Sequence, residues 1–198
     1  MKRILNILLI AALLTGCCED FWEKPPLIME LPPITEEGKD TFGCMIEDEV
    51  YVPQSRRMRF MPMYYIETTF PEYPNYRFGV TTYRFVGEKD IVQDAEVNFG
   101  NVIWDGRGNV ILWDSIRTTG TYTLYGTVKY NGNYYQALSN TSSLMITKLD
   151  TINGIISGQF YFQAIMNNNS LPIDMIDPDS KIITISNGRF DFCKGYYD

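Results

Sequence analysis

The feature that most constrains this chain is an alternating run, TYTLYGTVKYNGNYYQAL, at positions 121–138. Apolar and polar side chains alternate on both sides of Asn131-Gly132. Asn-Gly suits a type I′ turn, because both central residues of that turn need a positive φ. The run therefore predicts a β-hairpin of two tyrosine-rich strands.

Further strand patterns lie on both sides of this hairpin, and turn signals separate them at roughly the spacing typical of β-sandwiches and barrels. They are EVYVPQ (49–54), YRFGVTTYRFVG (76–87), NVIWDGRGNVILWD (101–114), SLMITKL (143–149), IISGQFYFQAIM (155–166) and KIITISNGRFDFC (181–193). The glycines of DGRGN (105–109) predict a second hairpin. Only GEKDIVQDA (87–95) hints at a helical turn. We expect an all-β fold, an antiparallel two-layer β-sandwich.

The N-terminus reads as a secretion signal over residues 1–16. Lys2 and Arg3 precede an apolar run that ends at Leu14 and is too short to cross about 30 Å of hydrocarbon. Leu14-Thr15-Gly16-Cys17 resembles a bacterial lipobox, in which the cysteine thiol accepts a diacylglycerol before cleavage. We expect lipidation of Cys17. The alternative is an ordinary secretion signal followed by chance cysteines.

Residues 17–38 are expected to form a lipidated acidic and proline-rich tether, and residues 39–198 a single domain. The acidic residues that follow Cys17 resemble the export signal of outer-membrane lipoproteins in Bacteroidetes, which favours a lipid-anchored, surface-facing location. The alternative is a solvated acidic spacer. Pro-Pro pairs stiffen the chain into a stalk, although Leu27, Ile28 and Met29 can instead lie along the domain edge.

Charge and composition exclude several classes of function. Without Lys2 and Arg3, 15 basic residues face 24 acidic ones, a net charge of −9 that repels nucleic acids and anionic lipid headgroups. The 198-residue chain contains no histidine, the usual general base and the commonest metal ligand. We therefore expect a protein that is not an enzyme, binds no nucleic acid and carries no cofactor.

Cys44 and Cys193 lie near the two ends of the expected domain. If the first and last strands are neighbours, these cysteines are candidates for a disulfide in an exported protein; a buried thiol at Cys44 is the alternative. The chain has no CxxC pair or Cys/His cluster, so no zinc site is expected. Asp177-Pro-Asp-Ser180 is mainly a turn signal rather than a calcium site.

Aromatic side chains are the best candidates for ligand contacts. Tyr73 and Tyr76 lie in the proline-broken segment FPEYPNY, and Trp104 and Trp113 flank the DGRGN turn. Such rings can stack on sugars. For each of them, packing in a half-buried strand is the alternative interpretation.

Three segments resemble a family of Bacteroidetes lipoproteins of unknown function, of the DUF6252 type. They are LPPITEEGKDTFGCMIEDEVYVP (31–53), ITKLDTINGIISGQFYFQA (146–164) and ITISNGRFDF (183–192). The resemblance implies an envelope location and a β-rich fold. It carries no catalytic residues.

In the last of these segments, Phe190 and Phe192 are expected to point inward. Arg189 and Asp191 then share the other face. That pair is either part of a binding site or a structural ion pair that ties the terminal strand to its neighbour.

Three classes of function follow. The first is a non-catalytic binding module at the outer membrane, held by its lipid anchor, with a protein or glycan partner. The second is a structural or assembly accessory of the envelope. The third is a hydrolase that acts on glycans without histidine.

Overall fold

The computed structural model describes residues 28–55, 66–69, 78–86, 92–100, 102–104, 110–113, 116–168 and 171–194. Strands account for nearly all of its regular structure, so the all-β expectation is confirmed. No helix within these ranges is long and apolar enough to cross a membrane.

Fourteen strands and two short 3₁₀ helices make up the described fold. They are β1 (Thr41–Ile46), β2 (Glu49–Tyr51), β3 (Gln54–Ser55), β4 (Ile66–Thr69), β5 (Gly79–Val86), β6 (Val92–Gly100), β7 (Val102–Trp104), β8 (Val110–Trp113), β9 (Gly120–Tyr122), β10 (Tyr125–Tyr130), β11 (Asn133–Ala137), η1 (Ser139–Thr141), β12 (Ser143–Asp150), β13 (Ile155–Met166), η2 (Ile173–Met175) and β14 (Ile182–Cys193).

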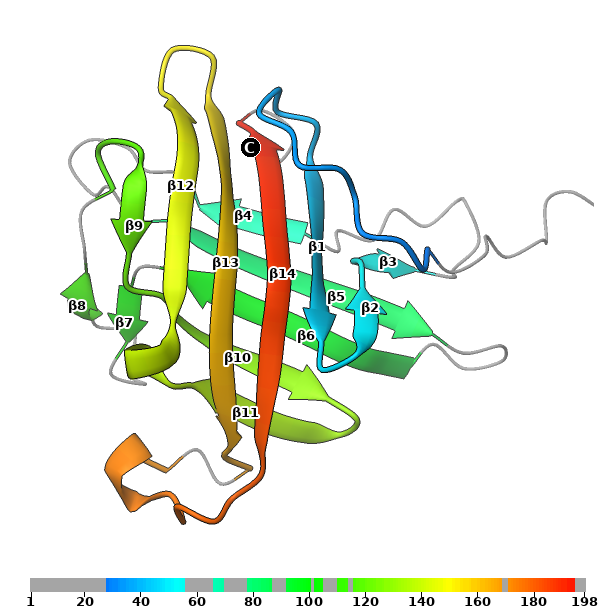
Figure 1. Ribbon diagram of the computed structural model, residues 1–198, viewed down its shortest axis with the longest axis vertical. Coiled ribbons are helices and arrows are strands. Elements are labelled where there is room, and N and C mark those ends of the chain that lie inside the picture. Colours follow the sequence, from blue (N-terminus) through cyan, green and yellow to red (C-terminus); the bar gives the residue numbers. More distant parts are fainter. Residues whose placement is uncertain are drawn as a thin grey trace, which may run out of the picture.

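Twelve of the strands belong to one sheet, and nine of these follow the order β2-β1-β14-β13-β11-β10-β6-β5-β3. The other three branch from this path: β12 pairs with β13 and β9, and β4 pairs with β5. In Figure 1 the long strands β12, β13, β14 and β1 cross in front of β4, β5, β6 and β10. The two layers are joined by hydrogen bonds through β11, so they are two sides of one nearly closed, barrel-like sheet rather than the two separate sheets of the expected sandwich.

β13 causes this continuity. It is 12 residues long and pairs with β14 along one edge. Along its other edge it pairs first with β12 and then, at Ala164–Met166, with β11. One strand thus bridges both layers, which no local sequence pattern specifies.

The predicted hairpins are present. Asn131 and Gly132 have φ values of 50° and 76°, as a type I′ turn requires, and Tyr130 pairs with Asn133. β7 pairs with β8 around the DGRGN segment, which itself lies outside the described residues. The hint of a helical turn at 87–95 is wrong where it can be checked, because Val92–Ala95 belong to β6.

Aromatic rings fill the space between the two layers. Phe160 and Phe162 point inward and are 4% and 0% exposed, whereas Tyr161 between them is 41% exposed, in the alternation typical of a strand with one face in the core. The rings of Phe99 and Phe160, from opposite layers, have centroids 4.3 Å apart. The core also contains Phe42, Phe78, Phe190 and Phe192.

The gap between β2 and β5 is closed by side chains. Arg84 of β5 is 5% exposed and donates hydrogen bonds to Glu49 (2.5 Å) and to the carbonyl oxygen of Val50 (2.9 Å) in β2. The Tyr130 hydroxyl donates to the other Glu49 oxygen (2.6 Å). Charged hydrogen bonds thus join the ends of the sheet where backbone pairing stops.

This network shifts two pKa values. Burial and the hydrogen bond to Glu49 raise the pKa of Tyr130 to about 12. For Glu49, burial alone would raise the pKa, but the bonds from Tyr130 and Arg84 outweigh it and lower the pKa. Both pKa shifts favour a neutral Tyr130 and an ionised Glu49 where side chains join the ends of the sheet.

The candidate disulfide between Cys44 and Cys193 is absent, and the alternative, a buried thiol at Cys44, is confirmed. Cys44 and Cys193 both carry free thiols, and burial raises the pKa of Cys44. The first and last strands are neighbours, as supposed, but Gly43 pairs with Arg189. Cys193 therefore lies about five residues, roughly 16 Å, along the ladder from Cys44, well beyond the 7 Å that a disulfide tolerates.

Candidate interaction surface

Most of the residues that the sequence nominated for ligand contacts cannot be followed in the structure. Tyr73 and Tyr76 lie outside the described residues, as does Cys17, the expected lipidation site. Trp104 ends β7 and Trp113 ends β8, where they pair with Val110 and Val102. Their side chains are not among those described.

Arg189 and Asp191 lie on the same face of β14, but the predicted ion pair between them does not form. Ion pairs of the described residues include Lys39–Glu37 and Arg84–Glu49. Arg189 donates to the carbonyl oxygen of Pro32 (3.3 Å), and Asp191 binds the same N-terminal segment by other contacts. Their common partner is the chain that precedes β1.

Asp191 is a buried carboxylate, 1% exposed, that accepts five hydrogen bonds. Two come from hydroxyl groups, of Thr35 at 2.6 Å and of Ser157 in β13 at 2.7 Å. Three come from backbone N–H groups, those of Glu37, Gly38 and Lys39, at 3.0, 2.8 and 3.2 Å.

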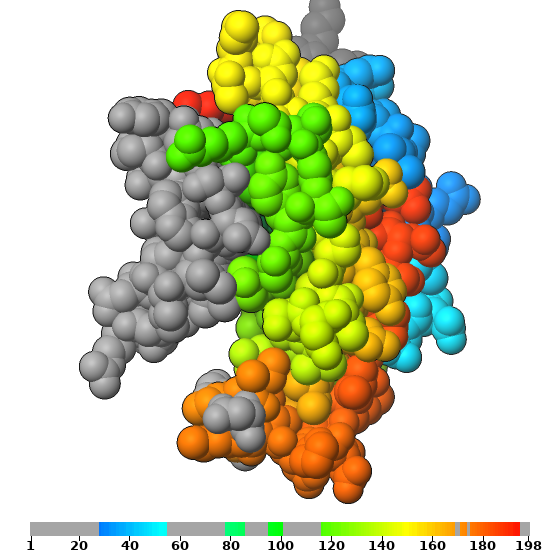
Figure 2. Space-filling view, turned by 60° about the vertical axis from the view of Figure 1, so that its left-hand side comes forward, coloured from blue at the N-terminus to red at the C-terminus, as the bar shows by residue number. Residues whose placement is uncertain are grey.

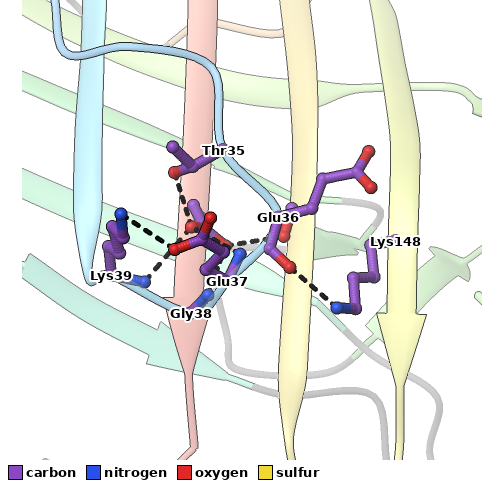
Figure 3. A network of polar contacts seen from close by, with 8 residues as sticks. Thr35, Glu36, Glu37, Gly38, Lys39 and Lys148 are labelled. Carbon is purple, nitrogen blue, oxygen red and sulfur yellow. Dashed lines mark hydrogen bonds and ion pairs between the residues drawn. The ribbon is translucent and has the colours of Figure 1, made fainter.

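These contacts fix residues 35–39 across the outer side of β14, and Lys148 of β12 reaches over to bind the Glu36 carbonyl oxygen at 2.7 Å (Figure 3). Burial alone would raise the pKa of Asp191, but the bonds from Thr35, Ser157 and the backbone outweigh it and lower the pKa. Asp191 is thus an ionised carboxylate that holds the N-terminal segment against β14 by hydrogen bonds.

The N-terminal segment contacts the domain from residue 28 onward. The side-chain amide of Gln54 exchanges two hydrogen bonds with the backbone of Ile28, at 2.8 and 3.3 Å. At Gly43, a Cβ atom would come within 2.6 Å of Pro32, so the chain passes very close to β1. Residues 28–40 therefore lie along the domain, the alternative that the sequence left open for Ile28 and Met29.

The other conspicuous surface is the end of the molecule formed by β11 and the β13–β14 loop. Large apolar side chains are exposed there: Leu171 (40%), Ile173 (45%), Met175 (66%) and Ile182 (45%). Tyr134 in β11 is 50% exposed. We call these five residues the apolar end surface. The loop stands at the lower end of the molecule, beyond the strands (Figures 1 and 2).

Asparagines fix the loop. The Asn167 side chain is 9% exposed; it donates to Gln136 (2.7 Å) and to the Leu171 carbonyl oxygen (2.8 Å), and accepts from the Leu171 N–H (2.8 Å). Asn168 accepts from the Tyr134 N–H (2.8 Å). These bonds order the backbone beneath the apolar end surface without covering its side chains.

Strand register places the two parts of this surface on one side of the sheet. Ile182 is paired with Ile165, and Ile165 with Gln136. Direct partners in a ladder project to the same face, and so do Gln136 and Tyr134, which are two residues apart. Tyr134 and Ile182 therefore share the outer face.

Acidic residues border the surface. Asp177 and Asp179 are exposed. The Asp177 carboxylate accepts the Asp179 N–H at 2.9 Å, and the Ser180 N–H donates to the Asp177 carbonyl oxygen at 2.9 Å, so the predicted turn is confirmed.

Comparison of the chain with models of protein families, with curated proteins and with solved structures gives no match. The geometry of the chain itself must therefore indicate its function. The apolar end surface was not predicted from the sequence, although LPIDMI (171–176) carries the signal: apolar residues that recur between the proline and aspartate residues of a loop.

Proposed function

We propose that this protein is a non-catalytic binding module of the outer membrane, anchored by lipid at Cys17, which binds another protein of the cell envelope. Membership of the DUF6252-type lipoproteins and a surface-facing position are parts of this proposal. The single observation that carries the binding role is the apolar end surface.

Exposed apolar side chains are common, but an ordered cluster of them is not. Ile173 and Met175 occupy one short 3₁₀ turn, η2, whose flanks are fixed by Asn167 and by the 177–180 turn. Prior ordering lowers the entropic cost of binding, because the backbone is already in place. The surface therefore has the properties of a binding epitope rather than of a loose connection.

A glycan partner is the second candidate. Tyr134 and Tyr161 are 50% and 41% exposed, and the Lys129 ammonium lies 5.6 Å from the centre of the Tyr134 ring. Such rings can stack on sugars. Glycan-array binding by the full chain that Tyr134→Ala abolishes would favour this candidate over a protein partner.

The anchor is tested by Cys17→Ala in the host cell. We expect the protein to move from the membrane pellet to the soluble fraction, because each buried CH₂ of an acyl chain contributes about 0.8 kcal/mol to membrane binding. Cys18→Ala is the matched control and should stay in the pellet. Retention of the Cys17→Ala variant on membranes would refute lipid anchoring at this residue.

Because residues 28–40 lie along the domain, they add no length between Cys17 and the domain. From residue 17 to residue 28 the chain spans at most about 40 Å, compared with about 75 Å for a tether that ended at residue 38. The lipid anchor would thus hold the domain close to the membrane, within reach of other membrane-bound proteins.

A further inference from the structure

The chemistry of the apolar end surface defines what can cover it. The loop that carries this surface, residues 166–182, contains three aspartates and one lysine, a net charge of −2. Asp177 and Asp179 are exposed directly after the apolar turn. A partner must therefore bury apolar side chains and also approach a border that is negative beside η2, while Lys129 lies at the opposite side, next to Tyr134.

These charges disfavour two occupants. An anionic lipid surface would be repelled by the loop and by the net charge of the chain. A second copy of this chain would bring the same aspartates face to face in a twofold contact, in which each patch meets itself. Like charges across such a contact cost affinity.

The shape of the loop also matters. The loop that carries η2 projects at the lower end of the molecule (Figure 2). Met175, the last residue of η2, is the most exposed residue of the apolar end surface. A projecting apolar turn buries most area when it enters a concave site. The complementary surface is thus a groove rather than a flat face.

We infer that the partner is an envelope protein with an apolar groove bordered by lysine or arginine side chains, and that the Ile173–Met175 turn enters this groove. The inference rests on the proposed function and specifies the partner's chemistry. Apolar burial supplies most of the affinity, while the border charges orient the encounter.

The test uses the full-length chain in its host cell with a photoreactive phenylalanine analogue at position 175. A second chain carries the analogue at position 152, where Ile152 is 93% exposed on the β12–β13 turn. We expect a crosslinked protein adduct from position 175 and none from position 152. Failure to form an adduct at position 175 would contradict the proposed function itself.

Three variants carrying the probe at position 175 then test the chemistry of the groove. Ile173→Ser should lower the adduct yield about tenfold, as expected for a central apolar residue. Asp177→Asn combined with Asp179→Asn should lower the yield about fivefold, since asparagine can keep the turn but removes both charges. Glu36→Gln removes an exposed charge far from the loop and should leave the yield unchanged.

The outcomes separate the two proposals. If the double aspartate substitution leaves the adduct yield at position 175 unchanged or increases it, the inference of a basic border on the partner is overturned. The proposed function would still stand. An adduct with the mass of two copies of this chain would identify self-association and overturn the inference. Equal denaturation midpoints for all variants would show that losses of yield reflect binding and not misfolding.

Discussion

At the scale of single residues, Asp191 has the greatest structural consequence. Its carboxylate joins β14 to β13 through Ser157 and to the N-terminal segment through Thr35 and three backbone N–H groups. A buried carboxylate is costly to desolvate, and five hydrogen bonds offset that cost. Asp191 is thus a structural residue.

Replacement of Asp191 by asparagine should lower the free energy of unfolding by about 2–3 kcal/mol, because an amide NH₂ would face donors that a carboxylate satisfies. The depressed pKa gives the sign of the pH dependence. The contribution is fully present above the ordinary aspartate pKa of 3.8 and is lost as the pH falls through the lower folded value.

Urea unfolding of both proteins between neutral pH and about pH 3 would measure this contribution. The difference between them should narrow at the acid end. If the difference in the free energy of unfolding grew as the pH fell, the stabilising role of the ionised Asp191 carboxylate would be contradicted. Thr35→Val removes one of the five donors and should cost only about 1 kcal/mol.

At the scale of elements, the β13–β14 ladder depends on close approach of backbone to rings. Gly188 pairs with Phe160, and a Cβ atom at position 188 would lie 2.5 Å from that ring. The register shifts between Phe160 and Phe162, opposite Asn187, which has a φ of 51°. The bulge at Asn187-Gly188 is thus combined with a tightly packed ring.

Gly188→Ala should therefore destabilise the protein by about 2–3 kcal/mol, because Phe160 is held between other core rings and cannot retreat. Gly132→Ala is the matched control: Gly132 has a φ of 76°, but a Cβ atom added there would have no other atom within 4 Å. It should cost only about 1 kcal/mol of backbone strain. Equal melting temperatures for the two variants would refute the steric explanation.

At the scale of the whole molecule, closure of the sheet relies on side chains. Backbone pairing runs from β2 to β3 and β5, and Arg84 connects these ends through Glu49 and Val50. A bare strand edge invites pairing with other chains. Because the β2 carbonyl of Val50 already accepts from Arg84, strand addition at this point is disfavoured.

Arg84→Met should lower the free energy of unfolding by about 2–3 kcal/mol, because it leaves the Val50 carbonyl and the Glu49 carboxylate without the guanidinium. Water can reach Glu49, whose side chain is 42% exposed, which moderates the loss. Lys39→Met breaks an ion pair whose side chains are 54% and 67% exposed. Denaturant unfolding of that control should differ from the wild type by less than about 0.5 kcal/mol.

Much of the fold follows from the sequence at the level of elements. Asn131-Gly132 has the conformation that its residues favour, and Phe160 and Phe162 point inward because alternation fixes the face of a strand. The outcome for Asp191 was different. Strand alternation placed Asp191 on the correct face of β14. It offered only Arg189, two residues away, as a partner, whereas the actual partners lie on other segments.

What the sequence determined by itself was local: where strands and turns occur, which side chains face the core, and an N-terminal pattern that predicts export. The tertiary structure alone decided that the sheet is continuous, that Cys44 and Cys193 stay apart, and that Asp191 accepts hydrogen bonds from residues 35–39. The physical reason is distance along the chain. Asp191 and Thr35 are separated by 156 residues, and periodicity reports on neighbours a few residues apart, not on contacts that only the closed sheet creates.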